Sequence, residues 1–193
     1  MEHQELTDLQ LWSKFKDGDD KTLAFIYSAN SKRLYWYGLS FTSNYLLVED
    51  AIQDLFSELI LSRKRLSETS NIQFYLLKSF KRILQRRIRQ EKKFRLSDTE
   101  KKYDFEVIHS IEYFIIHEED SYQQLRSLHE AIRTLTSRQK EAIYLKFSEG
   151  LGYEETAEIM DMTVESCRNL IWKAIKFLKN SLTQKSTANN DQY

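Results

Sequence analysis

The chain has 193 residues, of which 41% are hydrophobic and 13% aromatic, with no proline, four glycines and a formal net charge of zero. This composition is that of a folded globular protein, and apolar residues recurring at spacings of three and four predict an all-α fold. The single cysteine excludes an internal disulfide. No apolar run of about eighteen residues and no signal peptide is present, so we expect a cytoplasmic protein without membrane insertion.

Helical periodicity divides the chain into four parts. We expect an N-terminal helical domain over residues 6–95, an acidic linker over 96–120, a second helical domain over 121–182 and a disordered tail over 183–193. The zero net charge hides a segregation of charge. The last helix of the first domain ends in a block of eight basic residues and one acid over 81–95, whereas the linker holds eight acids and two lysines. The two blocks point to surfaces with different partners.

The basic block belongs to a predicted helix whose like charges lie three and four residues apart. Such charges repel one another, which indicates a polyanionic partner. The predicted nucleic-acid face of this helix consists of Lys78, Arg82, Arg86 and Arg89. Tyr75, near the start of the same helix, either stacks on an exposed base or is buried in the core.

The segment 154–176 keeps helical apolar spacing through Met160 and resumes it from Val164, although no glycine or proline lies between them. Asp161 can end the first helix, because aspartate is one of the few residues that adopt a positive φ at modest cost. Thr163 can then cap the second helix by accepting a backbone hydrogen bond. The pattern predicts a helix-turn-helix. The alternative is a plain helical hairpin packed on its neighbours.

The second helix of such a motif places its N-terminal part in the DNA major groove. Arginine, asparagine and glutamate read base edges, and lysines contact phosphates. The predicted DNA-facing residues are Glu165, Ser166, Arg168, Asn169, Trp172, Lys173 and Lys176.

Three segments carry a resemblance to a known family. The stretch "LHEAIRTLTSRQKEAIYLKFSEGLGYEETAEIMDMTVESCRNLIWKAIKFLKN" resembles the C-terminal, promoter-binding domain of bacterial RNA polymerase sigma factors of the extracytoplasmic-function class. The stretches "VEDAIQDLFSEL" and "YLLKSFKRILQRRIRQEKK" resemble the N-terminal domain of that class. The chain departs from the family pattern at Thr156, where isoleucine is usual, and at Asp161, where glycine is usual.

The resemblance implies a sigma factor that binds core RNA polymerase and directs promoter-specific transcription initiation. It assigns the minus-ten promoter element to the first domain and the minus-thirty-five element to the helix-turn-helix, and it admits an anti-sigma factor as a further partner. The linker resembles the family's acidic segment that threads towards the polymerase active site.

A "DxxQD" pattern marks the family helix that docks on the coiled coil of the largest polymerase subunit. The resemblance therefore implies a docking set of Glu49, Asp50, Gln53, Asp54 and Phe56. From the residues alone, the acids of this helix would be interpreted as a solvated face, and Phe56 also belongs to its apolar stripe.

Two other functions stay open at this stage. A stand-alone helix-turn-helix regulator would bind DNA as a dimer, but it would not need the "VEDAIQDLF" helix. A protein that only sequesters polymerase would not need the basic helix and the reading helix together. The four histidines show no metal-ligand spacing, and no nucleophile elbow or phosphate-binding glycine loop is present. We therefore expect no enzymatic activity, no catalytic residue, no metal and no cofactor.

Overall fold

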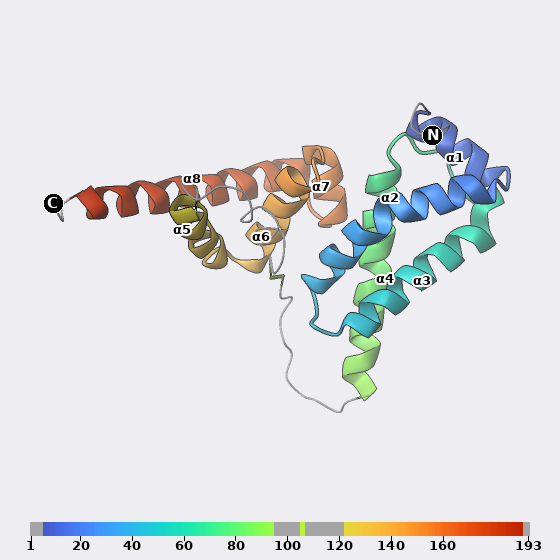
Figure 1. Ribbon diagram of the computed structural model, residues 1–193, viewed down its shortest axis with the longest axis horizontal. Helices are drawn as coiled ribbons and strands as arrows, with labels where there is room; N and C mark the ends of the chain where they lie inside the picture. The colour runs from blue at the N-terminus through green and yellow to red at the C-terminus, as the bar shows by residue number, and fades with distance from the viewer. Residues whose placement is uncertain (1–5, 95–104, 107–121, 191–193) are drawn as a thin grey trace. The chain divides into compact units, whose positions relative to one another are not determined.

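The computed structural model describes residues 6–94, 105–106 and 122–190 (Figure 1). All regular elements in these ranges are helical, which confirms the predicted all-α class. The chain divides into two compact units, an N-terminal unit over 1–100 and a C-terminal unit over 101–193. No helix in the described part of the chain is long and apolar enough to cross a membrane.

Within its described residues, the N-terminal unit is built from four α-helices. They are α1 (Asp8–Lys16), α2 (Asp20–Leu39), α3 (Tyr45–Ser62), which runs into a 3-10 turn (Arg63–Arg65), and α4 (Ile72–Phe94). The first three helices begin at a side chain that accepts a hydrogen bond from a free backbone amide, namely Thr7, Asp19 and Asn44. Such caps satisfy donors that the first helical turn leaves without partners.

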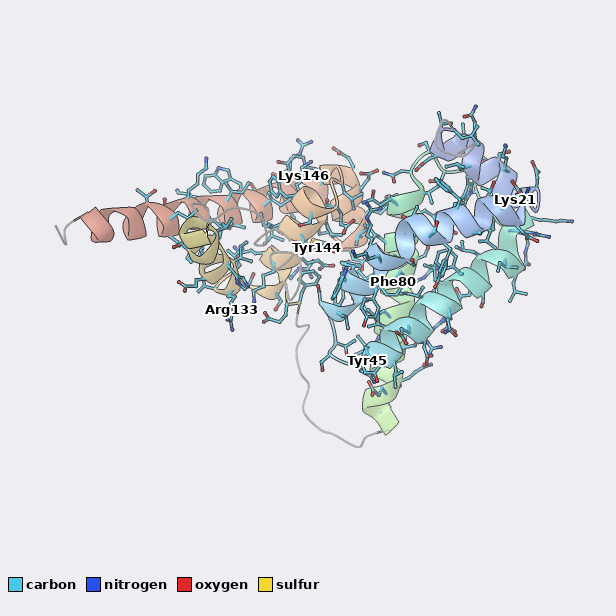
Figure 2. The ribbon with its side chains drawn as sticks, in the orientation of Figure 1. Lys21, Tyr45, Phe80, Arg133, Tyr144 and Lys146 are labelled. Carbon is cyan, nitrogen blue, oxygen red and sulfur yellow. The ribbon has the colours of Figure 1, made fainter. Side chains whose placement is uncertain are left out.

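The core of the N-terminal unit depends on a close approach at Gly38. A Cβ atom on this residue of α2 would lie 2.6 Å from Val48 Cγ1 of α3 and 2.9 Å from Phe80 Cζ of α4. Val48 and Phe80 are completely buried, and Figure 2 shows the side chain of Phe80 on α4. Three helices therefore meet where only glycine leaves room for all of them.

The C-terminal unit follows in a second series of helices. They are α5 (Tyr122–Arg133), α6 (Ser137–Ile143), a π-helical turn η4 (Tyr144–Ser148), α7 (Tyr153–Ile159) and α8 (Val164–Asn190). A core cluster of this unit consists of Ala131, Leu135, Ala174 and Leu178. Helix α8 continues to Asn190, so the structure differs from the disordered tail that we expected over 183–193. The polar residues up to Asn190 include no glycine or proline that would end the helix.

The break between α7 and α8 is the predicted turn. Asp161 has a positive φ of 51°. Among the described residues, the others with a positive φ are glycines. The amide of Met162 donates to the carbonyl oxygen of Ala157 at 3.0 Å. Thr163 Oγ1 accepts from the amide of Ser166 at 3.2 Å and caps α8. The predicted helix-turn-helix is confirmed.

Two residues of the predicted linker, Phe105 and Glu106, are described, and both belong to the C-terminal unit, where they contact η4 and α6. Phe105 is completely buried, and its ring centroid lies 5.7 Å from that of Tyr144. Lys140 Nζ donates to both carboxylate oxygens of Glu106, at 3.1 and 3.2 Å. Complete burial of a phenylalanine side chain stabilises by about 1.5–3 kcal/mol. The rest of the linker predicted over 96–120 lies outside the described residues.

One buried hydroxyl generates a prediction about stability. Thr156 Oγ1 on α7 is buried and has no hydrogen-bond partner among the described residues, whereas the equally buried Thr22 donates from its hydroxyl to Asp19 Oδ2 at 2.7 Å. An unsatisfied buried polar group costs about 1–3 kcal/mol. Thr156→Val, which removes the hydroxyl and keeps the shape, should raise the free energy of unfolding by about 1 kcal/mol.

Thr22→Val is the matched control, because the same substitution there removes a satisfied hydroxyl and should lower the free energy of unfolding by a similar amount, about 1 kcal/mol. Urea unfolding followed by far-ultraviolet circular dichroism measures both variants. A loss of stability in Thr156→Val would show that its hydroxyl has a partner after all.

Candidate polymerase and nucleic-acid interfaces

The predicted docking set divides between the surface and the core of the N-terminal unit. Glu49, Asp50 and Gln53 are exposed on α3, and Asp54 is half-buried. Phe56 is buried, with 6% of its surface exposed, and its ring centroid lies 4.9 Å from that of Tyr27. Phe56 therefore packs against α2, as its place in the apolar stripe of α3 indicates, and its docking role remains a prediction.

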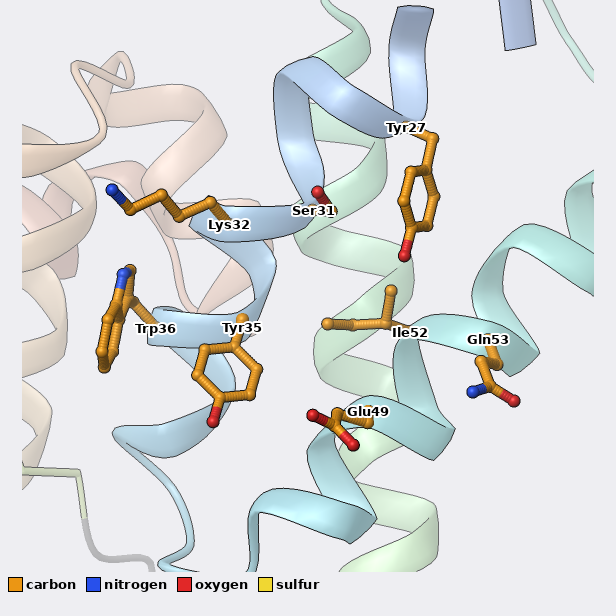
Figure 3. Close-up of a pocket in the computed structure, with 8 residues that line it drawn as sticks. All are labelled: Tyr27, Ser31, Lys32, Tyr35, Trp36, Glu49, Ile52 and Gln53. Atoms are coloured by element: carbon orange, nitrogen blue, oxygen red, sulfur yellow. The ribbon is translucent and has the colours of Figure 1, made fainter. Parts of the chain in front are cut away.

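A groove runs between α2 and α3 beside this face, with a volume of about 380 Å³. Figure 3 shows Glu49, Ile52 and Gln53 on α3 and the aromatic side chains on α2. The residues that α2 contributes are Tyr27, Ser31, Lys32, Tyr35 and Trp36. These aromatic residues of α2 are not among the residues predicted from the sequence. The signal was present, because positions 27, 31 and 35 recur every four residues and so share one helix face.

Arg87 links α4 to the acidic face of α3. Its Nε lies 2.6 Å from Asp54 Oδ2 and its Nη1 lies 3.2 Å from Asp50 Oδ2. The hydrogen bond from Arg87 lowers the pKa of Asp54 below its usual value, with a further contribution from the charge of Arg87. Two acids of the predicted docking face therefore have an intramolecular partner. Glu49 and Gln53 extend this face to the rim of the groove.

The predicted basic face of α4 is exposed at Lys78, Arg82, Arg86 and Arg89. Arg86 Nη2 lies 3.1 Å from Glu58 Oε1 of α3, with both side chains about half exposed. Tyr75 was predicted either to stack on a base or to be buried in the core, and its burial is intermediate. It is half-buried, with its ring centroid 4.9 Å from that of Trp12, and it keeps part of its surface accessible.

The seven predicted DNA-facing residues of α8 are all exposed, and they lie opposite a buried side that holds Cys167, Ile171 and Ala174. Burial raises the pKa of the Cys167 thiol. Arg168 Nη2 lies 3.3 Å from Glu154 Oε1 of α7, and the Arg168 guanidinium lies 5.4 Å from the ring centroid of Tyr153. Helix α7 therefore supplies two exposed contacts to Arg168 on the surface of α8.

The comparisons with known proteins match both units. The family model Sigma-70 region 2 matches residues 26–94, and Sigma-70, region 4 matches residues 125–178. RNA polymerase sigma factor SigV of Bacillus subtilis is 27% identical over 150 residues, which cover 78% of this chain and 84% of SigV.

The chain belongs to the sigma-70 family. The expected membership of the extracytoplasmic-function class is confirmed. The chain is a sigma factor, which binds core RNA polymerase and promoter DNA and directs promoter-specific transcription initiation without being an enzyme.

Two solved structures share the fold of this sigma factor. One is CnrH in complex with the cytosolic domain of CnrY, with a TM-score of 0.59 and 15% identity, covering 92% of this chain and 97% of the other. The other is the sigma factor RpoE in complex with the anti-sigma factor NepR from Bartonella quintana, with a TM-score of 0.56 and 20% identity, covering 85% and 96%. In the part of the sigma factor that the structure describes, no group of three or more His, Cys, Asp or Glu side chains is placed to hold a metal ion.

The ion pair of the sigma factor's Asp54 generates a prediction about titration. Arg87→Met keeps most of the alkyl stem but removes the guanidinium, so the pKa of Asp54 should rise towards its ordinary value of 3.8. Because the folded-state pKa is lowered, the pair stabilises the fold at neutral pH, and this contribution is lost as the pH falls through that pKa. Titration of the carboxyl carbon by NMR measures the pKa directly.

Arg89→Met is the control for this titration, because Arg89 is a cation on the same helix that donates from Nε to the carbonyl oxygen of Gln85 and does not lower the pKa of Asp54. The Asp54 titration should stay as in the wild type in that variant. An unchanged Asp54 pKa in Arg87→Met would show that another group lowers it.

Proposed function

We propose that this sigma factor docks on core RNA polymerase through the rim of the α2–α3 groove, with Glu49, Asp50 and Gln53 as the polar contacts. The observation that supports this most strongly is the combination of exposed acceptors on α3 with an aromatic groove beside them. A coiled coil can place apolar side chains in the groove and basic side chains on the acceptors. Asp54 supports the same face through its pair with Arg87.

The exposed face of α4 is the proposed minus-ten interface. Lys78, Arg82 and Arg89 present cations to the surface, and Arg86 joins them when it exchanges Glu58 for a phosphate. An ion pair with both partners about half exposed contributes little to stability, so this exchange costs little. The accessible part of Tyr75 is available for stacking on a base.

The exposed face of α8 is the proposed minus-thirty-five interface. Arg168 and Asn169 are the proposed readers of base edges, with Glu165 and Ser166 ahead of them in the first turns. Lys173 and Lys176 are the proposed phosphate contacts. Lys176 Nζ lies 5.0 Å from the ring centroid of Trp172, which positions the indole along the same face.

Two further assignments complete the proposed function. This sigma factor acts in the cytoplasm, where RNA polymerase and the chromosome are found. It is held inactive by an anti-sigma factor, and the support for this is its likeness in fold to RpoE, which was solved in complex with the anti-sigma factor NepR.

The docking proposal predicts a charge-dependent loss of polymerase binding. Glu49→Lys should raise the Kd for core RNA polymerase by about tenfold, because it replaces an acceptor at the groove rim with a like charge for a basic partner. Asp17→Lys changes the net charge by the same amount at an exposed position that ends α1, and it should bind normally. Titration of labelled sigma factor with core polymerase measures both Kd values. Equal Kd values for the two variants would rule out this rim as the docking site.

The two proposed roles on α8, reading base edges and contacting phosphates, predict two different losses of DNA binding. Asn169→Ala should cost about 1–3 kcal/mol at particular base pairs and relax the preference there, because a base reader is lost. Lys173→Ala should weaken binding to all sequences, because a phosphate contact is lost. It should also reduce the slope of log K against log salt concentration by about one. Holoenzyme binding to a library of minus-thirty-five variants at two salt concentrations separates these outcomes. If Asn169→Ala kept the wild-type preference at every position, this helix face would not be the reader.

A further inference from the structure

Helix α1 contacts the segment that joins α3 to α4 through the α1 stripe, which consists of Asp8, Trp12 and Lys16. These positions are four residues apart, so they share one face of α1. Trp12 Nε1 donates to the carbonyl oxygen of Ser67 at 2.9 Å, and Lys16 forms an ion pair with Glu68. Figure 1 shows α1 beside this segment. Successive turns of α1 therefore hold the chain just ahead of α4.

The α1 stripe also supplies a cap to α4. Asp8 Oδ2 accepts from the amide of Ile72 at 2.7 Å, across 64 positions of the sequence. Asn71 Oδ1 accepts from the amide of Phe74 at 2.9 Å. Both amides belong to the first turn of α4, which leaves its donors without helical partners. A carboxylate near a helix N-terminus also interacts favourably with the helix dipole. The start of α4 therefore depends on a residue of α1.

Tyr75 lies one turn into α4 and packs on the α1 stripe. Its ring centroid lies 4.9 Å from that of Trp12, with an angle of 57° between the rings. Trp12 is completely buried, whereas Tyr75 keeps part of its surface accessible. Trp12 can therefore act on a partner of Tyr75 only through the position of the Tyr75 ring.

We propose that the α1 stripe is a positioning device for promoter opening, which holds Tyr75 and the start of α4 ready to receive an unpaired base of the minus-ten element. The proposal rests on the proposed function, in which Tyr75 stacks on such a base. Ordering a side chain during binding costs affinity, and a ring that is already held avoids this cost. The corresponding gain is about twofold to tenfold in the equilibrium between the closed and the open promoter.

The contacts of the α1 stripe should contribute unequally to this gain. The hydrogen bonds of Trp12 and Asp8 are partly buried, so losing either leaves a backbone group unsatisfied where water has little access. The ion pair of Lys16 is more accessible, since the side chain of Glu68 is 58% exposed. Exposed ion pairs contribute little. Lys16→Met should therefore impair opening less than a substitution of Trp12 or Asp8.

The test measures promoter opening by reconstituted holoenzyme. A promoter selected from genomic fragments with the wild-type holoenzyme carries 2-aminopurine in its minus-ten element, and the rise in fluorescence gives the opening equilibrium. Trp12→Phe removes the indole N–H and keeps an aromatic ring in the core, and it should lower the equilibrium constant by about twofold to tenfold. Asp8→Ala should do the same. Asp8→Asn should retain most of the wild-type value, because its amide oxygen still accepts a hydrogen bond.

A second template separates positioning from a general loss of folded protein. The same promoter with a mismatched minus-ten element is already unpaired, so transcription from it at saturating holoenzyme does not depend on opening. Trp12→Phe and Asp8→Ala should reach the wild-type run-off level on this template. A reduction of equal size on both templates would show that the α1 stripe only stabilises the fold, and would overturn the proposal.

Asp20→Ala is the matched control for Asp8→Ala. It removes an acid from the first turn of the next helix, α2, where Asp20 is exposed. This variant should open the promoter like the wild type. An equal loss of opening in Asp20→Ala and Asp8→Ala would contradict a specific role of the α1 stripe.

Tyr75→Ala separates the proposal from the function on which it rests. Impaired opening in Tyr75→Ala, with wild-type opening in Trp12→Phe and Asp8→Ala, would overturn the role of the α1 stripe and leave the stacking role of Tyr75 in place. Wild-type opening in Tyr75→Ala would overturn that stacking role itself. Because Trp12 acts through Tyr75, adding Trp12→Phe to Tyr75→Ala should cause no further loss. Additive losses would show that Trp12 acts by another route.

Discussion

The ion pairs of Arg87 with Asp54 and Asp50 are the interaction on which the N-terminal unit's two surfaces depend. Helix α4 concentrates positive charge that would repel itself if it were alone in solution. The acids of α3 lie within reach of that charge, because α2, α3 and α4 converge at Gly38. The packing of three helices against a glycine thus places opposite charges side by side within the N-terminal unit.

The ion pairs of Arg87 connect the proposed polymerase contact with the proposed DNA contact of the N-terminal unit. The α3 face is the proposed polymerase contact and the α4 face is the proposed DNA contact, and Arg87 reaches from one helix to the other. A partner that binds Asp50 removes one of the two ion pairs of Arg87. The hydrogen bond to Asp54 still keeps the guanidinium in place. Asp54 is therefore a structural member of the proposed docking face, whose outer residues are more exposed.

The features that the sequence predicted correctly are those with local causes. The turn at Asp161 and the cap at Thr163 follow from the conformational preference of one residue and the hydrogen bond of another within three positions. Phe56 shows how a resemblance and a pattern can differ. Its place in the apolar stripe of α3 indicated burial, which the structure confirms, whereas the docking role that the family motif indicated remains a prediction. The helix beyond Leu182 differs from prediction, because a polar composition alone does not end a helix.

The features that the sequence did not predict depend on residues far apart in the chain. Arg87 and Asp54 are separated by 33 positions, and Lys140 and Glu106 by 34. No local spacing connects such pairs, since their meeting is decided by how helices cross and where a linker returns to the surface. The α2–α3 groove belongs to the same class, because its residues come from two helices. Helical periodicity predicts which side of a helix each residue lies on, but it does not predict which other helix packs against that side.

The burial of Cys167 gives this sigma factor an internal reporter. The chain's single cysteine lies at the centre of the helix-turn-helix, fully buried and with a raised thiol pKa. A thiol reagent can therefore react with it only when α8 separates from the helices packed against it. The rate of that reaction measures how often the reading helix opens in the unmodified chain. A cysteine introduced at the surface can, for the same reason, be labelled selectively while the native thiol is retained.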